Sequence, residues 1–180
     1  MPNVAPPPLY GLICGLLAGV AGDLGAARAE LESAWGPVLI ASDPRPWEES
    51  RYYEKDMGPA LLRQFLGFKR PVLVQQLPAL KHQAVALEAR LALGATRPRP
   101  VNIDPGILDA CALTLASTKR AGHRSWMEGE IWADITLIWQ KGGFLPLPWT
   151  YADFRDPRTL AFLTAFRRAI LPALNPQAKK

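Results

Sequence analysis

The feature that most constrains the fold of this chain is an uncharged run near its start, LYGLICGLLAGVAG, over residues 9–22. The run is shorter than the about 20 apolar residues that cross a bilayer. A signal peptide would have Lys or Arg before its apolar run, and no Lys or Arg precedes this one. We therefore expect a cytoplasmic protein in which residues 9–17 form a central strand covered on both faces.

The spacing of apolar residues after this strand predicts alternating elements. Helices are expected at 23–35, near 57–65 and at 78–93, and strands at 36–42, near 66–74 and at 101–103. Asp104-Pro105 and Asp156-Pro157 each predict a helix start, because Asp accepts first-turn amides and proline tolerates the first helical position. These two helices are expected to run from 104 to about 117, and from 157 into the C-terminal region.

The segment GEIWADITLIWQ alternates in the manner of a strand. Its odd-numbered residues are all apolar, so this face should meet the core; they are Ile131, Ala133, Ile135, Leu137 and Trp139. Glycine-containing pairs on either side indicate hairpin turns. Together the patterns predict a single α+β domain over residues 9–172, with a mixed sheet, a C-terminal hairpin or meander, and three or four packed helices. A flexible Pro-rich tail is expected at 1–8 and a frayed basic tail at 173–180.

The segment LASTKRAGHR, residues 115–124, gathers hydroxyl, cationic and imidazole groups beside an apolar run. If Glu128 and Gly129 are the central residues of the following turn, His123 faces Asp134 on the polar side of the hairpin. Such a pair suits a general base, or a cation that binds phosphate. A register shifted by one residue instead places Arg124 opposite Asp134.

The candidate catalytic pair is therefore His123 and Asp134, and Thr118, Lys119 and Arg124 lie close enough in sequence to hold a phosphate or carboxylate. Two alternatives stay open: a purely structural His–Asp pair, and a solvated basic turn at the end of a helix.

Further candidate ligand-binding residues come from other segments. Tyr52, Tyr53 and Lys55 lie in a long polar loop, which suits either a lid over a ligand or a loop held by its own ion pairs. Trp132 falls on the predicted polar face of its strand. Asn102, in VNIDPG, and Tyr151, in LPWTYADF, complete the set.

Several function classes are disfavoured by the sequence. It contains no GxxxxGK[ST], GxGxxG, HExxH, GxSxG or kinase signature, and no Cys/His spacing typical of zinc. No metal site or cofactor follows from the residues. The net charge of +5 is compatible with an anionic partner, but no long Lys/Arg run demands one.

The ordered segments YYEKDMG, VNIDPG, LASTK, HR, ADITLIW and PLPWTYADF resemble an uncharacterised bacterial family that is catalogued as a domain of unknown function. The resemblance extends from the first predicted strand to the last helix, which implies one intact domain. It implies no activity, cofactor or partner.

From the residues we expect a binding protein or an enzyme for a phosphate-bearing small molecule or nucleotide, held by the Lys/His/Arg/Asp cluster. If it is an enzyme, His123 would be the general acid or base. An RNA-binding module that stacks bases on Trp132 or Tyr151, and a protein-interaction or assembly protein, are the alternatives. The oligomeric state does not follow from the sequence.

Overall fold

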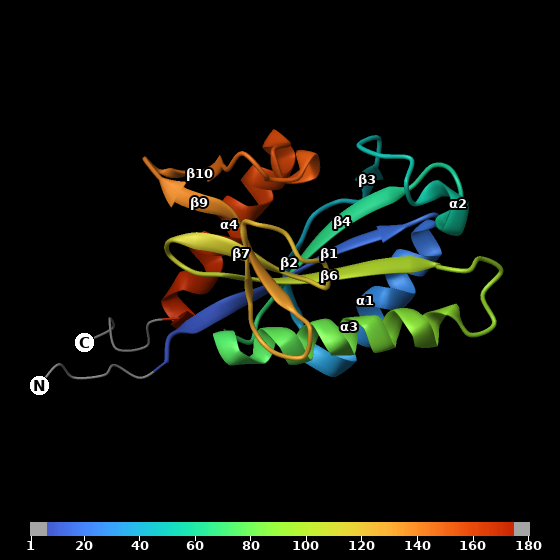
Figure 1. Cartoon of the computed structure of the whole chain (residues 1–180), viewed down its shortest axis with the longest axis horizontal. Coiled ribbons are helices and arrows are strands. Elements are labelled where there is room, and N and C mark those ends of the chain that lie inside the picture. The colour runs from blue at the N-terminus through green and yellow to red at the C-terminus, as the bar shows by residue number, and fades with distance from the viewer. Residues whose placement is uncertain (1–6, 175–180) are drawn as a thin grey trace, which may run out of the picture.

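The computed structural model describes residues 7–174. These residues form one ten-stranded sheet with the path β10-β9-β7-β6-β1-β4-β2, to which β3, β5 and β8 add at the sides (Figure 1). The strands are β1 (Leu9–Ala18), β2 (Val38–Ala41), β3 (Arg45–Pro46), β4 (Leu62–Phe68), β5 (Val72–Leu73), β6 (Val101–Leu108), β7 (Ala112–Ser117), β8 (Arg124–Trp126), β9 (Trp132–Gln140) and β10 (Gly143–Pro146). The α-helices are α1 (Ala21–Trp35), α2 (Glu54–Met57), α3 (Leu77–Ala92) and α4 (Pro157–Leu174), and 3-10 turns span Val74–Gln76 and Ala152–Phe154.

The α+β class is confirmed, but the described strand pairs are all antiparallel, where we expected a mixed sheet. The strands β1 and β2, which α1 connects, do run in the same direction, as a helical crossover favours. However, β4 lies between them and is antiparallel to both. The order of the strands in space, which the sequence does not reveal, accounts for the difference.

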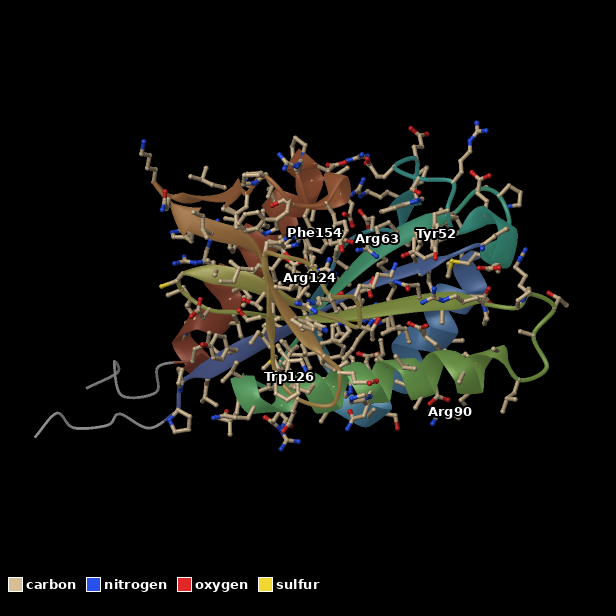
Figure 2. All side chains as sticks on the ribbon, viewed as in Figure 1. Tyr52, Arg63, Arg90, Arg124, Trp126 and Phe154 are labelled. Carbon is tan, nitrogen blue, oxygen red and sulfur yellow. The ribbon has the colours of Figure 1, made fainter. Side chains whose placement is uncertain are left out.

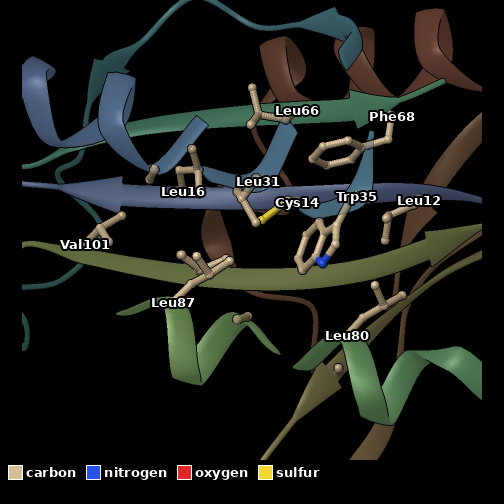
Figure 3. Close-up of a cluster of buried hydrophobic side chains, with 14 of the residues drawn as sticks. Leu12, Cys14, Leu16, Leu31, Trp35, Leu66, Phe68, Leu80, Leu87 and Val101 are labelled. Carbon is tan, nitrogen blue, oxygen red and sulfur yellow. The ribbon is translucent and has the colours of Figure 1, made fainter. Parts of the chain in front are cut away.

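Helices cover both faces of the sheet. Leu12, Cys14 and Leu16 of β1 pack with α1 and α3 in one buried cluster, whereas Ile13 packs with α4 in another (Figures 1 and 3). Successive side chains of a strand point to opposite faces, so a strand between two helical layers must be apolar throughout. The predicted central strand is therefore confirmed, and it runs to Ala18.

The long helices agree with their predicted apolar faces. Leu24 and Leu31 of α1, and Ala84 and Leu87 of α3, are buried as their spacing requires. The start of α4 is also confirmed, because Asp156 caps it: the amide of Arg158 donates to Asp156 Oδ1 at 2.7 Å.

The helix expected at 104–117 is wrong, because this segment forms the hairpin of β6 and β7. Ile107 belongs to the cluster on the α1/α3 face and Leu108 to the cluster on the α4 face, so its apolar residues alternate across the sheet. Asp109 accepts from the amides of Cys111 and Ala112, both at 2.8 Å, and thus forms the turn. The short apolar run fits both the helical and the strand period, and it forms a strand because β6 pairs with β1.

The elements predicted for 57–74 are also misplaced. Helix α2 ends at Met57, because Gly58 adopts a φ of 87°, and the next residues lead into β4. Phe65 and Leu66 of β4 pack on opposite faces of the sheet, which is strand behaviour. The strand expected at 66–74 corresponds to the end of β4 and the short β5.

The faces of β9 differ from the prediction. Ile135 is 47% exposed, whereas Asp134 and Thr136 are buried. The register between β7 and β9 shifts after Leu113, which pairs with Leu137, while Thr114 pairs with Ile135. This bulge interrupts the strict alternation, so that the buried residues of β9 include both Thr136 and Leu137, and Asp134 lies on the buried side before the bulge.

The described elements run from β1, which begins at Leu9, to α4, which ends at Leu174. Of the expected tail 1–8, Pro7 and Pro8 are exposed and precede β1, and residues 1–6 lie outside the described residues. Helix α4 continues to Leu174, two residues beyond the predicted end of the domain, and residues 175–180 lie outside the description. No helix within residues 7–174 is long and apolar enough to cross a membrane.

Candidate functional site

The register of the β8–β9 hairpin places Arg124, not His123, opposite Asp134. The predicted His123–Asp134 register is wrong by one residue. Trp126 pairs with Trp132, so the connecting loop runs over residues 127–131 and is centred on Gly129, not on the Glu128-Gly129 pair. Gly129 and Glu130 in this loop both have positive φ values, 57° and 61°. The turn rests on α3, where Nε2 of His82 lies 2.8 Å from the carbonyl oxygen of Gly129.

Arg124 is fully engaged inside the protein. Its Nε atom donates to Asp134 Oδ2 at 2.9 Å, and its Nη1 atom to Ser117 Oγ at 2.9 Å and to the Lys119 carbonyl at 2.7 Å. Nη2 donates to the Tyr151 hydroxyl. A guanidinium offers five N–H donors in a fixed fork, and here that fork ties β7, the β7–β8 loop, β9 and Tyr151 together. Arg124 therefore positions the site and is not free for a ligand.

His123 still contacts Asp134, although it does not face it in register. Its Nε2 atom lies 3.4 Å from Asp134 Oδ2, and its ring stacks on Trp149 with centroids 5.0 Å apart. Trp149 is itself fixed by donating from Nε1 to the Ile135 carbonyl at 2.8 Å. His123 is thus held beside the buried carboxylate, and its catalytic role stays a prediction.

A cavity lies where the sheet splits between β6 and β7. The two strands pair only from Gly106 to Leu108 within the described chain, so the first half of β6 has no strand neighbour on this side. Two side chains of α3 take the place of that strand at Ile103. Glu88 accepts from the Ile103 amide at 2.7 Å, and Lys81 donates to the Ile103 carbonyl at 3.1 Å. Buried backbone groups need such partners, and here α3 supplies them.

The cavity has a volume of about 460 Å³, which is within the usual range for small-molecule sites. Figure 2 shows Arg63 and Phe154, which line it, near the middle of the molecule, with Tyr52 to one side and Arg124 below. The lining side chains that carry charge are Arg63, Lys81, Glu88, Arg99, Asp104, Lys119, Asp134 and Asp153. Those that carry hydroxyl or amide groups are Ser50, Tyr52, Tyr53, Asn102, Ser117, Thr118 and Tyr151.

The inner floor of the cavity consists of paired charges. The Lys81 ammonium lies 3.0 Å from Asp104 Oδ1. The Arg99 guanidinium lies 2.8 Å from Glu88, and Asn102 accepts from Arg99 and donates to Asp104. Five polar side chains from α3, β6 and the loop between them thus form one network.

Two carboxyl groups of this floor have opposite pKa shifts. Burial raises the pKa of Glu88 above its usual value, although the Arg99 guanidinium and the Ile103 amide oppose the shift. Burial would also raise the pKa of Asp104, but the charges of Lys81 and Arg63 and the bonds from Lys81 and Asn102 outweigh it, and the pKa is lowered. Asp104 is therefore an ionised acceptor at neutral pH.

Arg63 crosses the floor from β4. Its Nη2 atom lies 2.8 Å from Asp153 Oδ2 and its Nη1 atom 4.0 Å from Asp104 Oδ2, and its side chain is 5% exposed. A side chain at Gly15 would come within 2.8 Å of this guanidinium, so glycine in the neighbouring strand makes room for it.

The outer end of the cavity lies between two loops. The Lys119 ammonium lies 5.4 Å from the ring centroid of Tyr52, and the Lys55 ammonium lies 5.6 Å from the same centroid. Tyr52 packs edge-on against Tyr53, whose pKa is raised by burial. Within residues 7–174, Lys119 forms no ion pair. The predicted lid residues therefore lie at the opening, although no closing motion is implied.

The structure brings together most of the predicted site residues. Lining the cavity are Tyr52, Tyr53, Asn102, Thr118, Lys119, Asp134 and Tyr151. Outside its lining are Lys55, His123, Arg124 and Trp132, of which Trp132 lies under the guanidinium of Arg120. Six further charged residues, which the sequence did not predict as site residues, line the cavity: Arg63, Lys81, Glu88, Arg99, Asp104 and Asp153. The Asp104-Pro105 pair predicts a helix cap, which hid the role of Asp104. Lys81 and Glu88 lie seven residues apart, two turns along one helix, and this spacing could have indicated a shared polar face.

Within the described chain, no group of three or more His, Cys, Asp or Glu side chains is arranged to hold a metal ion. A family model described as "Domain of unknown function (DUF4416)" matches residues 10–169. No curated protein and no solved structure matches the chain.

Proposed function

We propose that this chain, which belongs to the DUF4416 family of unknown function, binds a phosphate-bearing small molecule or nucleotide in the cavity between β6 and β7. The observation that carries the proposal is the position of Lys119. Its ammonium borders the cavity without an ion-pair partner among the described residues, and Thr118, which carries a hydroxyl group, lines the same wall. Ammonium and hydroxyl groups at one end of a concave site suit a phosphate.

The charge balance of the cavity supports an anionic ligand. Arg63, Lys81 and Arg99 each pair with a lining carboxylate, and Asp134 pairs with Arg124 from outside the lining. Lys119 is the lining charge that remains uncompensated within residues 7–174. The eight charged lining residues sum to zero, and Arg124, just outside the lining, brings the site to one net positive charge, with Lys119 as the cation that an anion would contact.

A concave site of this volume favours a small ligand over RNA, which would need a wide basic face. The proposal includes no reaction, because His123, the predicted general acid or base, does not line the cavity. It retains the cytoplasmic location expected from the sequence.

The test is a thermal-shift screen of the intact chain against inorganic phosphate, nucleoside monophosphates and triphosphates, sugar phosphates and a short RNA, followed by calorimetric titration. A ligand that binds the folded state raises the melting temperature by mass action. We expect at least one phosphate compound to bind, and Lys119→Ala to weaken it by tenfold or more, about 1.4 kcal/mol.

Arg120→Ala is the matched control, because Arg120 is the next residue of the same loop and does not line the cavity. It should leave the affinity unchanged. The proposal is wrong if no phosphate compound binds, or if the two substitutions weaken binding equally. Binding of RNA alone, with a steep dependence on salt, would favour the RNA-binding alternative.

A further inference from the structure

We infer that the ligand carries a single anionic group, which binds at Lys119, and an uncharged part bearing hydroxyl groups, a sugar, which occupies the inner floor with Asp104 as its hydrogen-bond acceptor. This inference rests on the proposed function and specifies the ligand class. It follows from how charge and hydrogen-bonding capacity are distributed along the cavity.

The inner floor is electrically neutral. Lys81 is 3.0 Å from Asp104, Arg63 is 2.8 Å from Asp153, and Arg99 is 2.8 Å from Glu88. A second phosphate placed here would compete with carboxylates that already hold every cation of the floor. Like charges in a poorly solvated site repel strongly, so the inner part of the ligand must be uncharged.

The floor is nevertheless polar, and an apolar group would leave its hydrogen-bonding groups without partners. Asp104 is the accessible carboxylate of the floor, with a side chain that is 33% exposed, compared with 13% for Glu88 and 2% for Asp153. A carboxylate offers about four lone-pair sites. The side chains of Lys81 and Asn102 occupy one site on each oxygen, so further sites remain for donors from a ligand.

Asp104 is also held in place as an acceptor. Lys81, Asn102 and Arg63 surround its carboxylate, keep it ionised and fix its orientation. Arg99, linked to Asp104 through Asn102, has a side chain that is 34% exposed, and its guanidinium can donate to the oxygen of a hydroxyl group. A carboxylate next to a donor is suited to hydroxyl groups, each of which both donates and accepts.

The outer end of the cavity, at Lys119, carries a positive charge that is unpaired among the described residues, in place of paired charges. Lys119 is exposed, and Thr118, which carries a hydroxyl group, lines the wall beside it. In an extended β6–β7 pairing, Ser117 would stand opposite Asp104, so the anion and sugar subsites lie on facing walls of the split. Because Lys119 and Asp104 line one cavity of about 460 Å³, we expect a compact ligand, such as a sugar monophosphate.

The experiment compares three probes by calorimetric titration of the intact wild-type chain: ribose 5-phosphate, 2-deoxyribose 5-phosphate and inorganic phosphate. We expect ribose 5-phosphate to bind at least tenfold more tightly than inorganic phosphate, with the deoxy sugar in between. Asp104→Asn should remove most of the difference between the sugar phosphate and phosphate, while binding of inorganic phosphate stays within twofold. Asp43→Asn, an exposed aspartate outside the cavity lining, is the control and should change neither affinity.

The wild-type comparison needs no variant, so it remains decisive even if Asp104→Asn lowers the stability of the fold. Equal affinities for ribose 5-phosphate and inorganic phosphate would overturn the inference and leave the proposed function standing. The same holds if a folded Asp104→Asn protein loses affinity for both probes alike. Failure of every phosphate compound to bind would overturn both.

Discussion

The Nε atom of Arg124 lies 2.9 Å from Oδ2 of Asp134, directly across the β8–β9 hairpin, and the two side chains are 7% and 2% exposed. Removing one partner of such a buried pair leaves the other charge without compensation. We expect Arg124→Met to lower the free energy of unfolding by about 3–5 kcal/mol, measured by urea denaturation.

The double variant Arg124→Met/Asp134→Leu removes both charges and should recover part of that loss. Lys119→Ala, in the exposed loop between β7 and β8, should change stability by less than about 0.5 kcal/mol. A loss below about 1 kcal/mol in Arg124→Met would mean that this network does not hold the hairpin in place.

The contact of Glu88 with the Ile103 amide predicts a local effect on the sheet. Glu88→Ala removes the acceptor and should cost about 1–3 kcal/mol, because a buried donor loses its partner. Hydrogen exchange of the Ile103 amide should accelerate more than that of its neighbours in β6. Glu30→Ala, which removes an exposed carboxylate paired with Arg90, should cost less than about 1 kcal/mol. Unchanged exchange at Ile103 would contradict the assignment of α3 as a substitute strand.

Asp156 predicts a dependence of stability on acid pH. Its hydrogen bond with the Arg158 side chain, helped by the Arg158 amide and the charge of Arg45, lowers its pKa from 3.8 to about 2. A carboxyl group whose pKa is lower in the folded state stabilises the fold above its unfolded pKa and loses that contribution as the pH falls toward the folded value.

The stabilising contribution of Asp156 should therefore disappear between pH 3.8 and about 2. The melting temperature of Asp156→Asn should fall less steeply than that of the wild type over this interval, while the asparagine still caps α4. Parallel curves for the two proteins would show that Asp156 has no such role. Asp43→Asn serves as the control.

Gly67 lies where α4 packs closest to the sheet. A Cβ atom there would come within 2.4 Å of the Phe166 ring, so Gly67→Ala should cost about 1–3 kcal/mol through overpacking. Gly25 is exposed inside α1 and has no neighbour within 4 Å of such an atom. Gly25→Ala should therefore stabilise the chain by about 0.5–1 kcal/mol, as expected for glycine within a helix. Chemical denaturation of both variants checks the pair, and similar effects of the two would refute this account of the packing.

The sequence predicts the elements whose pattern has one physical meaning. The uncharged run of β1 can only be buried, the stripe of α3 fits one helical face, and Asp156-Pro157 is followed by an apolar helical stripe. The pair Asp104-Pro105 has the same local chemistry but lies in a strand, because β1 supplies a partner along the whole of β6. Pairing between distant strands is a tertiary property, and local residue preferences do not encode it.

The candidate site was predicted in part for the same reason. Lys119, Asn102 and Tyr52 come from segments that looked polar and irregular, and they do line the cavity. Arg63 and Lys81 lie within regular elements and enter the site only because β7 separates from β6. The five-residue loop between Trp126 and Trp132, in place of the expected two-residue turn, shifts the register by one residue and places Arg124 where His123 was expected.

The split between β6 and β7 joins the two layers of the molecule. Lys81 and Glu88 belong to a helix that packs on one face of the sheet, yet their head groups border a cavity whose other walls, including Arg63 and Phe154, lie on the opposite face. A molecule bound in that cavity would therefore affect how α3 packs against the other face of the sheet. By reciprocity, any partner that displaced α3 on the far side would alter how tightly the cavity retains its contents.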